Sequence, residues 1–536
     1  MPAPVRQPRA AARPAKATSV AAPDTRAARV GAPPLAWSAA VGAVFAAIYL
    51  ALAPAVTGPK DSSEFTLALA LGTAAHPTGY PLFILLGHPF VLVLHALGAT
   101  WAYAANAWSA AGAGVAMGLL HALGARLVPP GVRLARSRRF ALALIPVALF
   151  GTNPVWTLDA VMVEVYSWHL AWVCAACLFV VAMARAFAAE RAPWSGRRLA
   201  TAAALWGLLC GIGMAHHVTA ALQILALTAA LALAGARAGL ARPKYLLLAI
   251  AASLVPLASY AFVAWRAFHP AAYQWPTLEP SWRAVFDHVL GQSYRDLLGR
   301  FAPTGIQAEM LRRWCWPVLF PALIGLVVAA IRARGAERVI VGGLLAAALL
   351  QALYAFNYGV LDPSSYFEPA MALALLAIPA LGASLVARRR SVVAPAVAVA
   401  ILVAVPAVWG LWDTDGARRG DLIVSRRIRA LWASLPSGPC LVFWRHDMAT
   451  TLRVFQILER SRADVYAQNP DALTWPGPRR DFERRFGFDP LAGLEPLTAE
   501  KVAAIPDNVN RLTRLPVVLF DLEGITLHTL DKPRSP

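Results

Sequence analysis

Two carboxylates and an imidazole lie in one short stretch, DSSEFTLALALGTAAHPTGYPLF, at residues 61–83. Asp61 and Glu64 are three residues apart, so on a helix they would face one cavity, with His76 twelve residues further on. A carboxylate can take a proton from a hydroxyl group, while a second carboxylate positions a cation. We therefore choose Asp61 as a candidate general base. In the alternative interpretation, Asp61 only caps a helix over 62–71, because Asp is favoured at helix N-termini.

The composition is that of a membrane protein. Of 536 residues, 58% are hydrophobic and 15% are charged, and several apolar runs are long enough to cross a bilayer. The formal charge of +20 comes mostly from short basic clusters between these runs. Such clusters are typical of cytoplasmic loops rather than of a nucleic-acid-binding surface. We predict an α-helical polytopic protein of the cell (inner) membrane that binds no nucleic acid.

The basic clusters also predict the topology. Residues 1–34 are rich in Ala, Pro and Arg, which indicates a disordered basic tail in the cytoplasm. Segment 80–97 would place five arginines outside if it crossed the membrane, so we predict a membrane-lying or re-entrant helix there. The remaining apolar runs predict about eleven spans in a membrane domain over 35–412, at 35–56, 101–127, 140–155, 164–187, 199–214, 218–236, 245–265, 316–331, 339–358, 369–387 and 392–412.

Residues 413–536 contain no predicted span. The segments PCLVFW, ATTLRVFQILERSR, ADVYAQN and LPVVLFDL alternate strand and helix character. They predict a small α/β domain, which the topology places on the extracytoplasmic side. We interpret His446 and Asp447 in this domain as ordinary loop residues.

The polar residues that interrupt the apolar runs fall almost entirely on the predicted outer side. Ionisable side chains at membrane depth are costly and usually face a cavity or a partner. Their common side therefore predicts one polar site. Its candidate residues are Asp61, Glu64 and His76, Tyr80, Glu164 and Tyr166 in VEVYSW, His216 and His217 in GMAHHVT, Arg266 in YAFVAWRAFHP, and Asp362 and Tyr366 in LDPSSYFEPA.

Five motifs, in this order, resemble a bacterial multi-spanning family related to transmembrane protein O-mannosyltransferases, within the GT-C glycosyltransferase superfamily. DSSEFTLALALGTAAHPTGYPLFILLGHPF is similar to its first-loop signature, roughly Asp-x-Gly-Glu-Phe followed by His-Pro-Pro-Gly-Tyr-Pro-Leu. Here Ser63 replaces the glycine and Thr78 the second proline. The family's later elements are similar to these segments of the chain: NPVWTLDAVMVEVYSWHL, GIGMAHHVTAAL, AWRAFHPAAYQWP with FDHVLGQSYRDLL, and LDPSSYFEPA.

The resemblance implies a GT-C-like fold, with membrane-lying helices in the first outer loop and a catalytic carboxylate. It implies transfer of a sugar from a polyprenyl-phosphate-linked donor to a protein or glycan acceptor on the extracytoplasmic side. Attack by an acceptor hydroxyl passes through an oxocarbenium-like state, and an inverting transfer needs one base and no covalent intermediate. Asp61 is the expected base, and Glu64 is its expected partner.

Cations are needed to stabilise the departing phosphate. Arg266 is expected to clamp it with its planar guanidinium, although an arginine that extends to the outer interface is the alternative. His216 and His217 are adjacent on a helix and point about 100° apart, so we do not expect both to ligate one ion. One of them, with His76, is expected to contact phosphate, or they are satisfied interfacial histidines.

The remaining candidates are expected to position the substrate. Glu164 can orient a sugar hydroxyl or Arg266, and Asp362 lies in the last outer motif. Tyr80, Tyr166 and Tyr366 are more often aromatic residues of the membrane interface than sugar platforms.

Two rival functions use the same residues differently. A transporter or flippase of a lipid-linked sugar would also need polar residues on the inner half of several spans, and few are present. A non-enzymatic scaffold would leave the outer polar residues unexplained. Metal dependence stays open: no clear ligand triad is visible in the sequence, a divalent metal is possible, and no other cofactor is expected.

Overall fold

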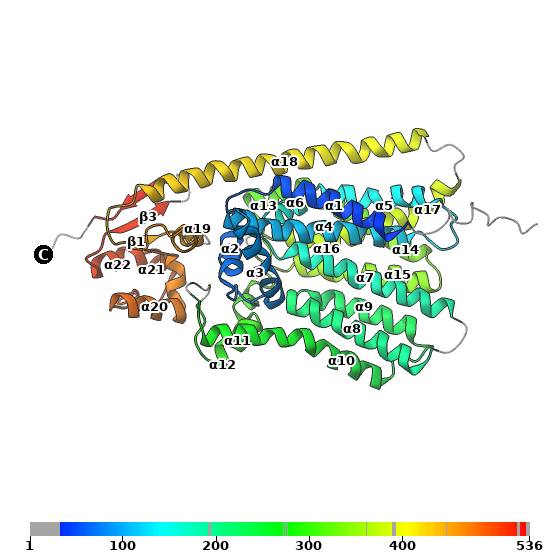
Figure 1. Ribbon diagram of the computed structural model, residues 1–536, viewed down its shortest axis with the longest axis horizontal. Helices are drawn as coiled ribbons and strands as arrows, with labels where there is room; N and C mark the ends of the chain where they lie inside the picture. Colours follow the sequence, from blue (N-terminus) through cyan, green and yellow to red (C-terminus); the bar gives the residue numbers. More distant parts are fainter. Residues whose placement is uncertain are drawn as a thin grey trace, which may run out of the picture.

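Long apolar helices lie side by side over most of the chain (Figure 1). The computed structural model describes residues 33–190, 194–271, 273, 275, 277–360, 362–388, 393–445, 448–521 and 526–531. The predicted basic tail is outside these residues up to position 32, and so are His446 and Asp447.

Eight helical segments of the described chain are long and apolar enough to cross a membrane, or nine if the bent pair α5–α6 is one span. They confirm a helical polytopic membrane protein. The segments are α1 (Leu35–Leu52), α4 (Trp101–Leu127), α7 (Tyr166–Ala189), α8 (Gly196–His216), α10 (Pro243–Leu257) with η2 (Ala258–Tyr260) and α11 (Ala261–Phe268), α13 (Gly305–Met310) with η4 (Leu311–Cys315) and α14 (Trp316–Arg332), α15 (Ala336–Ala355), and η5 (Ser364–Phe367) with α16 (Glu368–Leu375) and α17 (Ala377–Arg388).

The other two predicted spans correspond to helices of unusual length. The segment predicted at 218–236 is α9 (Ala220–Gly235), whose 16 residues are fewer than the roughly 20 that a bilayer core requires. The segment predicted at 392–412 is the first half of α18 (Val393–Ala433). At 41 residues and about 1.5 Å per residue, α18 is about 60 Å long. It runs along the bundle and continues without a break into the C-terminal domain, across the predicted boundary at 413 (Figure 1).

The first loop contains two short helices at one end of the bundle (Figure 1). Helix α2 (Ser62–Leu71) has the bounds predicted from the sequence, and α3 (Pro81–Ala96) lies where a membrane-lying or re-entrant helix was predicted at 80–97. Neither is among the candidate spans. Gly72 ends α2 with φ +58°, a left-handed conformation that glycine adopts at low cost, and this turn leads the chain back toward the start of α2.

A bend of 74° separates α5 (Arg136–Gly151) from α6 (Pro154–Val161). Asn153 accepts a hydrogen bond from the backbone of Val155, and Pro154 occupies the first turn of α6. A capping residue followed by proline starts a new helix rather than continuing the old one. The bend brings α6, with Asp159, to the first loop.

The C-terminal domain is a four-stranded mixed sheet with helices, as predicted for a small α/β domain. Strand order is β2-β1-β3-β4, with β1 parallel to β2 and β3, and with β4 antiparallel to β3. The strands are β1 (Cys440–Phe443), β2 (Val465–Gln468), β3 (Val517–Asp521) and β4 (Thr526–Thr529), and the helices are α19 (Met448–Arg453), η6 (Val454–Leu458), η7 (Pro470–Thr474), α20 (Pro476–Phe486), α21 (Ala499–Ala503) and α22 (Ile505–Leu512).

Two further short helices, α12 (Trp282–Val289) and η3 (Gln292–Leu297), follow α11 near the first loop. His288 of α12 contacts the backbone carbonyl of Ala75, at 3.0 Å from its Nε2 atom. Segments about 210 residues apart in sequence therefore meet beside His76.

The orientation in the membrane is a prediction that cysteine labelling checks. Single cysteines at Ser293 in η3 and at Ser434 after α18 should react with a membrane-impermeant thiol reagent added outside, whereas a cysteine at Ser137 of α5 should not. All three positions are exposed, and the native cysteines are buried or half-buried, so background labelling should be low. Outside labelling at Ser137 with protection of Ser293 would reverse the predicted orientation.

Candidate active site

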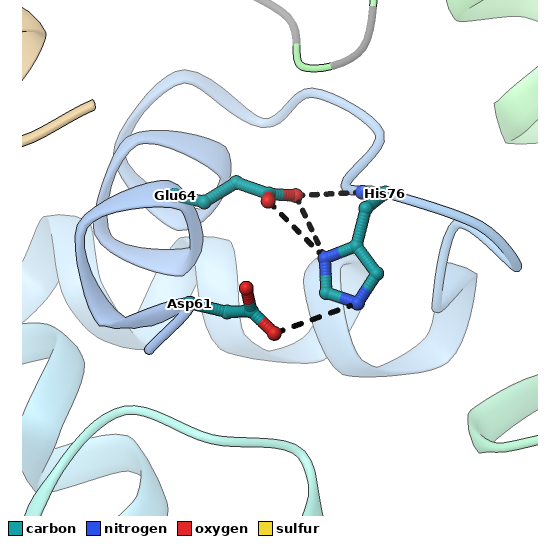
Figure 2. A group of neighbouring side chains, drawn as sticks. All are labelled: Asp61, Glu64 and His76. Atoms are coloured by element: carbon teal, nitrogen blue, oxygen red, sulfur yellow. Dashed lines mark hydrogen bonds and ion pairs between the residues drawn. The ribbon is translucent and has the colours of Figure 1, made fainter. Parts of the chain in front are cut away.

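Asp61, Glu64 and His76 converge at the start of α2 (Figure 2). The Glu64 carboxylate accepts a hydrogen bond from the His76 backbone N–H at 2.6 Å, and both of its oxygens lie 3.1 Å from Nδ1 of the imidazole. On the other side of the ring, Nε2 lies 3.8 Å from Asp61 Oδ2. The imidazole therefore lies between two carboxylates from one helix start.

The two carboxylates differ in their access to solvent. The Asp61 side chain is 37% exposed, whereas that of Glu64 is 4% exposed. Asp61 occupies the N-cap position of α2, but its side chain makes no capping hydrogen bond. Its carboxylate is therefore available for an incoming hydroxyl group, while Glu64 is committed to His76.

Charge holds the imidazole in its cationic form. Burial alone would lower the pKa of His76, but the charges and hydrogen bonding of Glu64, with the charge of Asp61, outweigh burial and raise that pKa to about 10. Burial raises the pKa of Glu64, and the imidazolium opposes this rise. The result is a buried imidazolium–carboxylate pair with the more exposed Asp61 beside it.

Lys60, which precedes Asp61, joins the first loop to two distant segments. Its ammonium group contacts Asp159 of α6 at 2.6 Å, and it also pairs with Asp362 and contacts Ser365. Burial would lower the pKa of Lys60, but these carboxylates outweigh it and raise the pKa. The residue has φ +60°, a conformation that is costly for a residue with a Cβ. The lysine thus fixes the backbone next to Asp61.

The site carries more acidic than basic groups among the described residues. Glu164 is 2% exposed, and its Oε1 atom has no hydrogen-bond partner in the described part of the chain. Burial, together with the charges of Asp61 and Asp159, raises the pKa of Glu164. A buried carboxylate oxygen without a donor costs free energy unless a ligand supplies one. The full acidic set is Asp61, Glu64, Asp159, Glu164, Asp362 and Glu368, beside the cations Lys60 and His76.

Aromatic rings connect His76 to His217. The Tyr80 hydroxyl lies 3.1 Å from Nε2 of His76, and the Tyr80 ring lies 5.6 Å from that of His217. Tyr166 lies 5.7 Å from His217 and 5.6 Å from Tyr366, between ring centroids. The three tyrosines therefore pack around the site instead of forming a belt at the membrane interface.

The hydrogen bonds of His217 fix its tautomer. The backbone N–H of Thr219 donates to Nδ1 at 3.2 Å, so Nδ1 carries no proton, and the hydrogen of the neutral ring is on Nε2. Burial, with the nearby charges of His216 and His76, lowers the pKa of His217 to about 3. Its Nε2 is buried and has no partner among the described residues. His217 is therefore a neutral hydrogen-bond donor that lacks an acceptor.

Two predicted phosphate contacts lie apart from this group. The ring of His216 stacks on Phe83, and its Nε2 lies 3.1 Å from the carbonyl of Val165. Arg266 lies on Trp265 and donates to the carbonyl of Leu71 at 3.4 Å. Leu71 is the last residue of α2, about 14 Å along the helix from its start at about 1.5 Å per residue. The carboxylate of Asp362, a predicted substrate-positioning residue, forms an ion pair with Lys60.

The three residues of Figure 2 could hold a metal ion by distance, since one ligand atom from each lies within 4.8 Å of the others. The hydrogen bonding of His76 decides which of these residues could bind one ion. Its two ring nitrogens face different carboxylates, so an ion between Nε2 and Asp61 would leave Glu64 hydrogen-bonded to Nδ1, which is how a carboxylate commonly supports a metal-bound histidine. An ion there would need the neutral imidazole, because a protonated ring has no free nitrogen lone pair, and we derive no chemical step through a metal.

Sequence reasoning missed several residues of the site. Lys60 and Asp159 form its second ion pair, Glu368 lies near Asp159, and the rings of Tyr294 and Tyr358 lie near His76 and Tyr366. The available signal was that Asp159 and Glu368 are acidic residues within otherwise apolar segments, which is the same criterion that selected Glu164.

Comparison with known proteins agrees with the predicted class. Residues 61–237, about a third of the chain, match the family model of the protein O-mannosyl-transferase TMEM260 N-terminal domain. No curated protein sequence matches the chain. ArnT from Cupriavidus metallidurans, in its crystal structure bound to undecaprenyl phosphate, is 14% identical, with a TM-score of 0.50 over 78% of this chain and 85% of ArnT.

A second solved structure is similar over more of the chain. The archaeal oligosaccharyltransferase AglB from Archaeoglobus fulgidus, in complex with an inhibitory peptide and a dolichol-phosphate, is 13% identical, with a TM-score of 0.49 over 90% of this chain and 69% of AglB.

The likeness to ArnT shows a GT-C-like fold of the membrane domain, and the family match over residues 61–237 agrees with the predicted class, a membrane glycosyltransferase. Residues 61–237, which contain the first three of the five motifs, are similar to the N-terminal domain of protein O-mannosyl-transferases, as these motifs predicted. The matched segment contains Asp61, Glu64, His76, Glu164 and His217.

The His76–Glu64 pair predicts a pH-dependent contribution to stability. Glu64→Gln should lower the free energy of unfolding at pH 7 by about 3 kcal/mol, because it breaks a buried ion pair. The folded-state pKa of His76 is raised from 6.5 to about 10, so the pair's contribution is complete below about pH 6.5 and is lost as the pH rises through about 10.

The difference in unfolding between Glu64→Gln and wild-type protein should therefore shrink between neutral pH and pH 10, as measured by denaturation in detergent. Glu337→Gln, which breaks the more exposed pair with Arg185, is the matched control and should show a smaller, less pH-dependent effect. A difference from wild type that stays constant to pH 10 would contradict a charged His76.

Proposed function

We propose that the protein transfers a sugar from a polyprenyl-phosphate-linked donor to an acceptor hydroxyl on the extracytoplasmic side, with inversion at the anomeric carbon. The observation that carries this proposal is the accessible Asp61 carboxylate beside the His76–Glu64 pair (Figure 2), within the segment that matches protein O-mannosyl-transferases. The undecaprenyl phosphate bound to ArnT, which shares the fold, supports a polyprenyl-phosphate donor. The acceptor is an extracytoplasmic protein or glycan.

Asp61 is the general base in this proposal. Its carboxylate takes the proton of the acceptor hydroxyl while the hydroxyl oxygen bonds to the anomeric carbon. The bond from that carbon to the phosphate oxygen breaks, and the lipid phosphate leaves with the bonding electrons. The imidazolium of His76, 3.8 Å from Asp61, orients the carboxylate, and Glu64 holds the imidazolium in turn.

The other polar groups match a donor that combines hydroxyl groups with a phosphate. The unpartnered Oε1 of Glu164 accepts a hydrogen bond from a sugar hydroxyl, and the unpartnered Nε2–H of His217 donates to a phosphate oxygen. Tyr80, Tyr166 and Tyr366 contribute ring faces and hydroxyls between them. Arg266, at the far end of α2, contacts the lipid headgroup region rather than the reacting phosphate.

Transfer by purified protein in detergent tests the function. Radiolabelled polyprenyl-phosphate sugars and an extracytoplasmic extract should give a labelled acceptor with wild-type protein. Asp61→Asn should lower the rate by roughly 10²–10⁴ with little loss of folded protein, because it removes the base and keeps its size. If wild-type protein moves lipid-linked sugar across liposomes but forms no glycosidic bond in detergent, the protein is a transporter.

His217 supplies a second prediction. His217→Ala should lower kcat/KM by about 10–100-fold, since a hydrogen bond to a charged group contributes about 1.5–3 kcal/mol. His217→Gln keeps an N–H donor and should recover part of this loss. His95→Ala is the matched control, because His95 contacts the carbonyl of Ala99 and stacks on Trp101 at the end of α3, and it should leave transfer unchanged. Normal transfer by His217→Ala would exclude the proposed contact.

A further inference from the structure

The C-terminal domain contacts the start of α2. The hydroxyls of Ser63 and Thr451 lie 2.7 Å apart, and both side chains are buried, at 1% and 4% exposure. Ser63 stands between Asp61 and Glu64 in the sequence, and Thr451 belongs to α19 of the C-terminal domain. Helices α19 and η6 both pack against α2, which places the domain directly on the helix that carries the candidate base (Figure 1).

A second attachment holds the domain from the side of α11 and α12. Trp275, between these helices, packs on Trp475 at 5.4 Å between ring centroids. Glu279 forms an ion pair with Arg480 of α20. Gly477 lies so close to this segment that a Cβ there would come within 2.2 Å of the carbonyl oxygen of Thr277.

A third attachment runs through α18. Thr414 and Thr157 of α6 share a hydrogen bond of 2.5 Å, two residues from Asp159, and Asp413 accepts one from Trp314. Further along α18, Arg429 binds Glu459, at the end of η6, through two hydrogen bonds of 2.6 Å. With attachments on three sides, the face of the domain that meets α2 is fixed relative to the membrane domain.

We propose that the C-terminal domain is a working part of the active site: the hydrogen bond between Ser63 and Thr451 sets the position of the first turn of α2 and, through it, the reach of the Asp61 carboxylate. This inference rests on the proposed function. Ser63 and Thr451 are positioning residues in it, and neither touches the substrate. A displacement of about 1 Å in a catalytic group can lower the rate about 100-fold, so the loss of this one buried hydrogen bond can have a large effect on the rate.

The bond depends on the hydroxyl of Ser63. Ser63 replaces the glycine of the resembled pattern, and glycine has no hydroxyl to offer to Thr451. In a buried contact, a hydroxyl that loses its hydrogen-bond partner is left unsatisfied. Loss of either hydroxyl should therefore shift α2 or leave a polar group unpaired at the interface.

The test compares Thr451→Val, which keeps the shape and removes the hydroxyl, with Thr451→Ser, which keeps the hydroxyl. Thr451→Val should lower kcat about 10-fold with an unchanged KM for the lipid-linked donor, and Thr451→Ser should restore most of it. The double variant Ser63→Ala with Thr451→Val should be no slower than either single variant, because both remove one bond. Thr474→Val is the matched control, since it removes a hydroxyl bond to Asp471 inside the same domain.

A kcat for Thr451→Val equal to that of wild type, or equal losses in Thr451→Val and Thr474→Val, would overturn the inference. Equal losses in Thr451→Ser and Thr451→Val would do so as well. Each variant is compared at equal amounts of folded protein, measured by size-exclusion chromatography and thermal unfolding in detergent.

Cross-linking tests the contact without any activity. In full-length protein with Ser63→Cys and Thr451→Cys together, mild oxidation should form a disulfide that joins the two halves of the chain after proteolysis between them. Ser63→Cys with Thr474→Cys should not form one. A missing cross-link in the first pair overturns the inference whatever the protein transfers. A cross-link without any transfer activity, by contrast, would leave the contact standing and count against the proposed function.

Discussion

The position of one imidazole between two carboxylates governs the candidate site. His76 is charged because Glu64 is buried against it, and Glu64 tolerates burial because the imidazolium and the His76 backbone N–H both satisfy it. A buried carboxylate without these partners would cost several kcal/mol. The same contact closes the chain from Glu64 to His76 into a compact loop, so α2 and the turn after Gly72 take their places from it. The two carboxylates then differ in burial: Glu64 is buried against His76, and Asp61 is accessible to solvent.

A second constraint is the excess of acidic groups around this pair. Lys60 offsets part of it by joining Asp159 and Asp362, which lie about 200 residues apart. Among the described residues, Glu164 has an oxygen without a donor, and His217 has a donor without an acceptor. Buried polar groups without hydrogen-bond partners cost free energy, but they suit a ligand that has many hydroxyls and an anionic group. The polar chemistry of the site is thus complementary to a sugar phosphate rather than to an apolar molecule.

Local patterns predicted more of the fold than of the site. Helix α2 and the span Trp101–Leu127 have the predicted bounds, because the apolar residues that define each helix are consecutive in the sequence. The first-loop residues could be proposed from spacing because Asp61, Glu64 and His76 are close in sequence. Lys60 with Asp159 could not, because that pairing needs the bend between α5 and α6. The sequence indicated a phosphate contact for Arg266 because of its charge and its position at the end of a span, whereas tertiary packing puts it at the far end of α2.

The contact between α2 and the C-terminal domain has the same long-range origin and changes how the domain boundary should be understood. Composition divides the chain at 413, where apolar spans give way to alternating strands and helices. The structure crosses that boundary with an unbroken helix, α18, and with the Ser63–Thr451 bond between residues 388 positions apart. A domain held on three sides cannot move freely without disturbing the first turn of α2. The membrane domain and the C-terminal domain therefore form one unit around Asp61, and a mutation in the sheet domain can act on the first loop through packing alone.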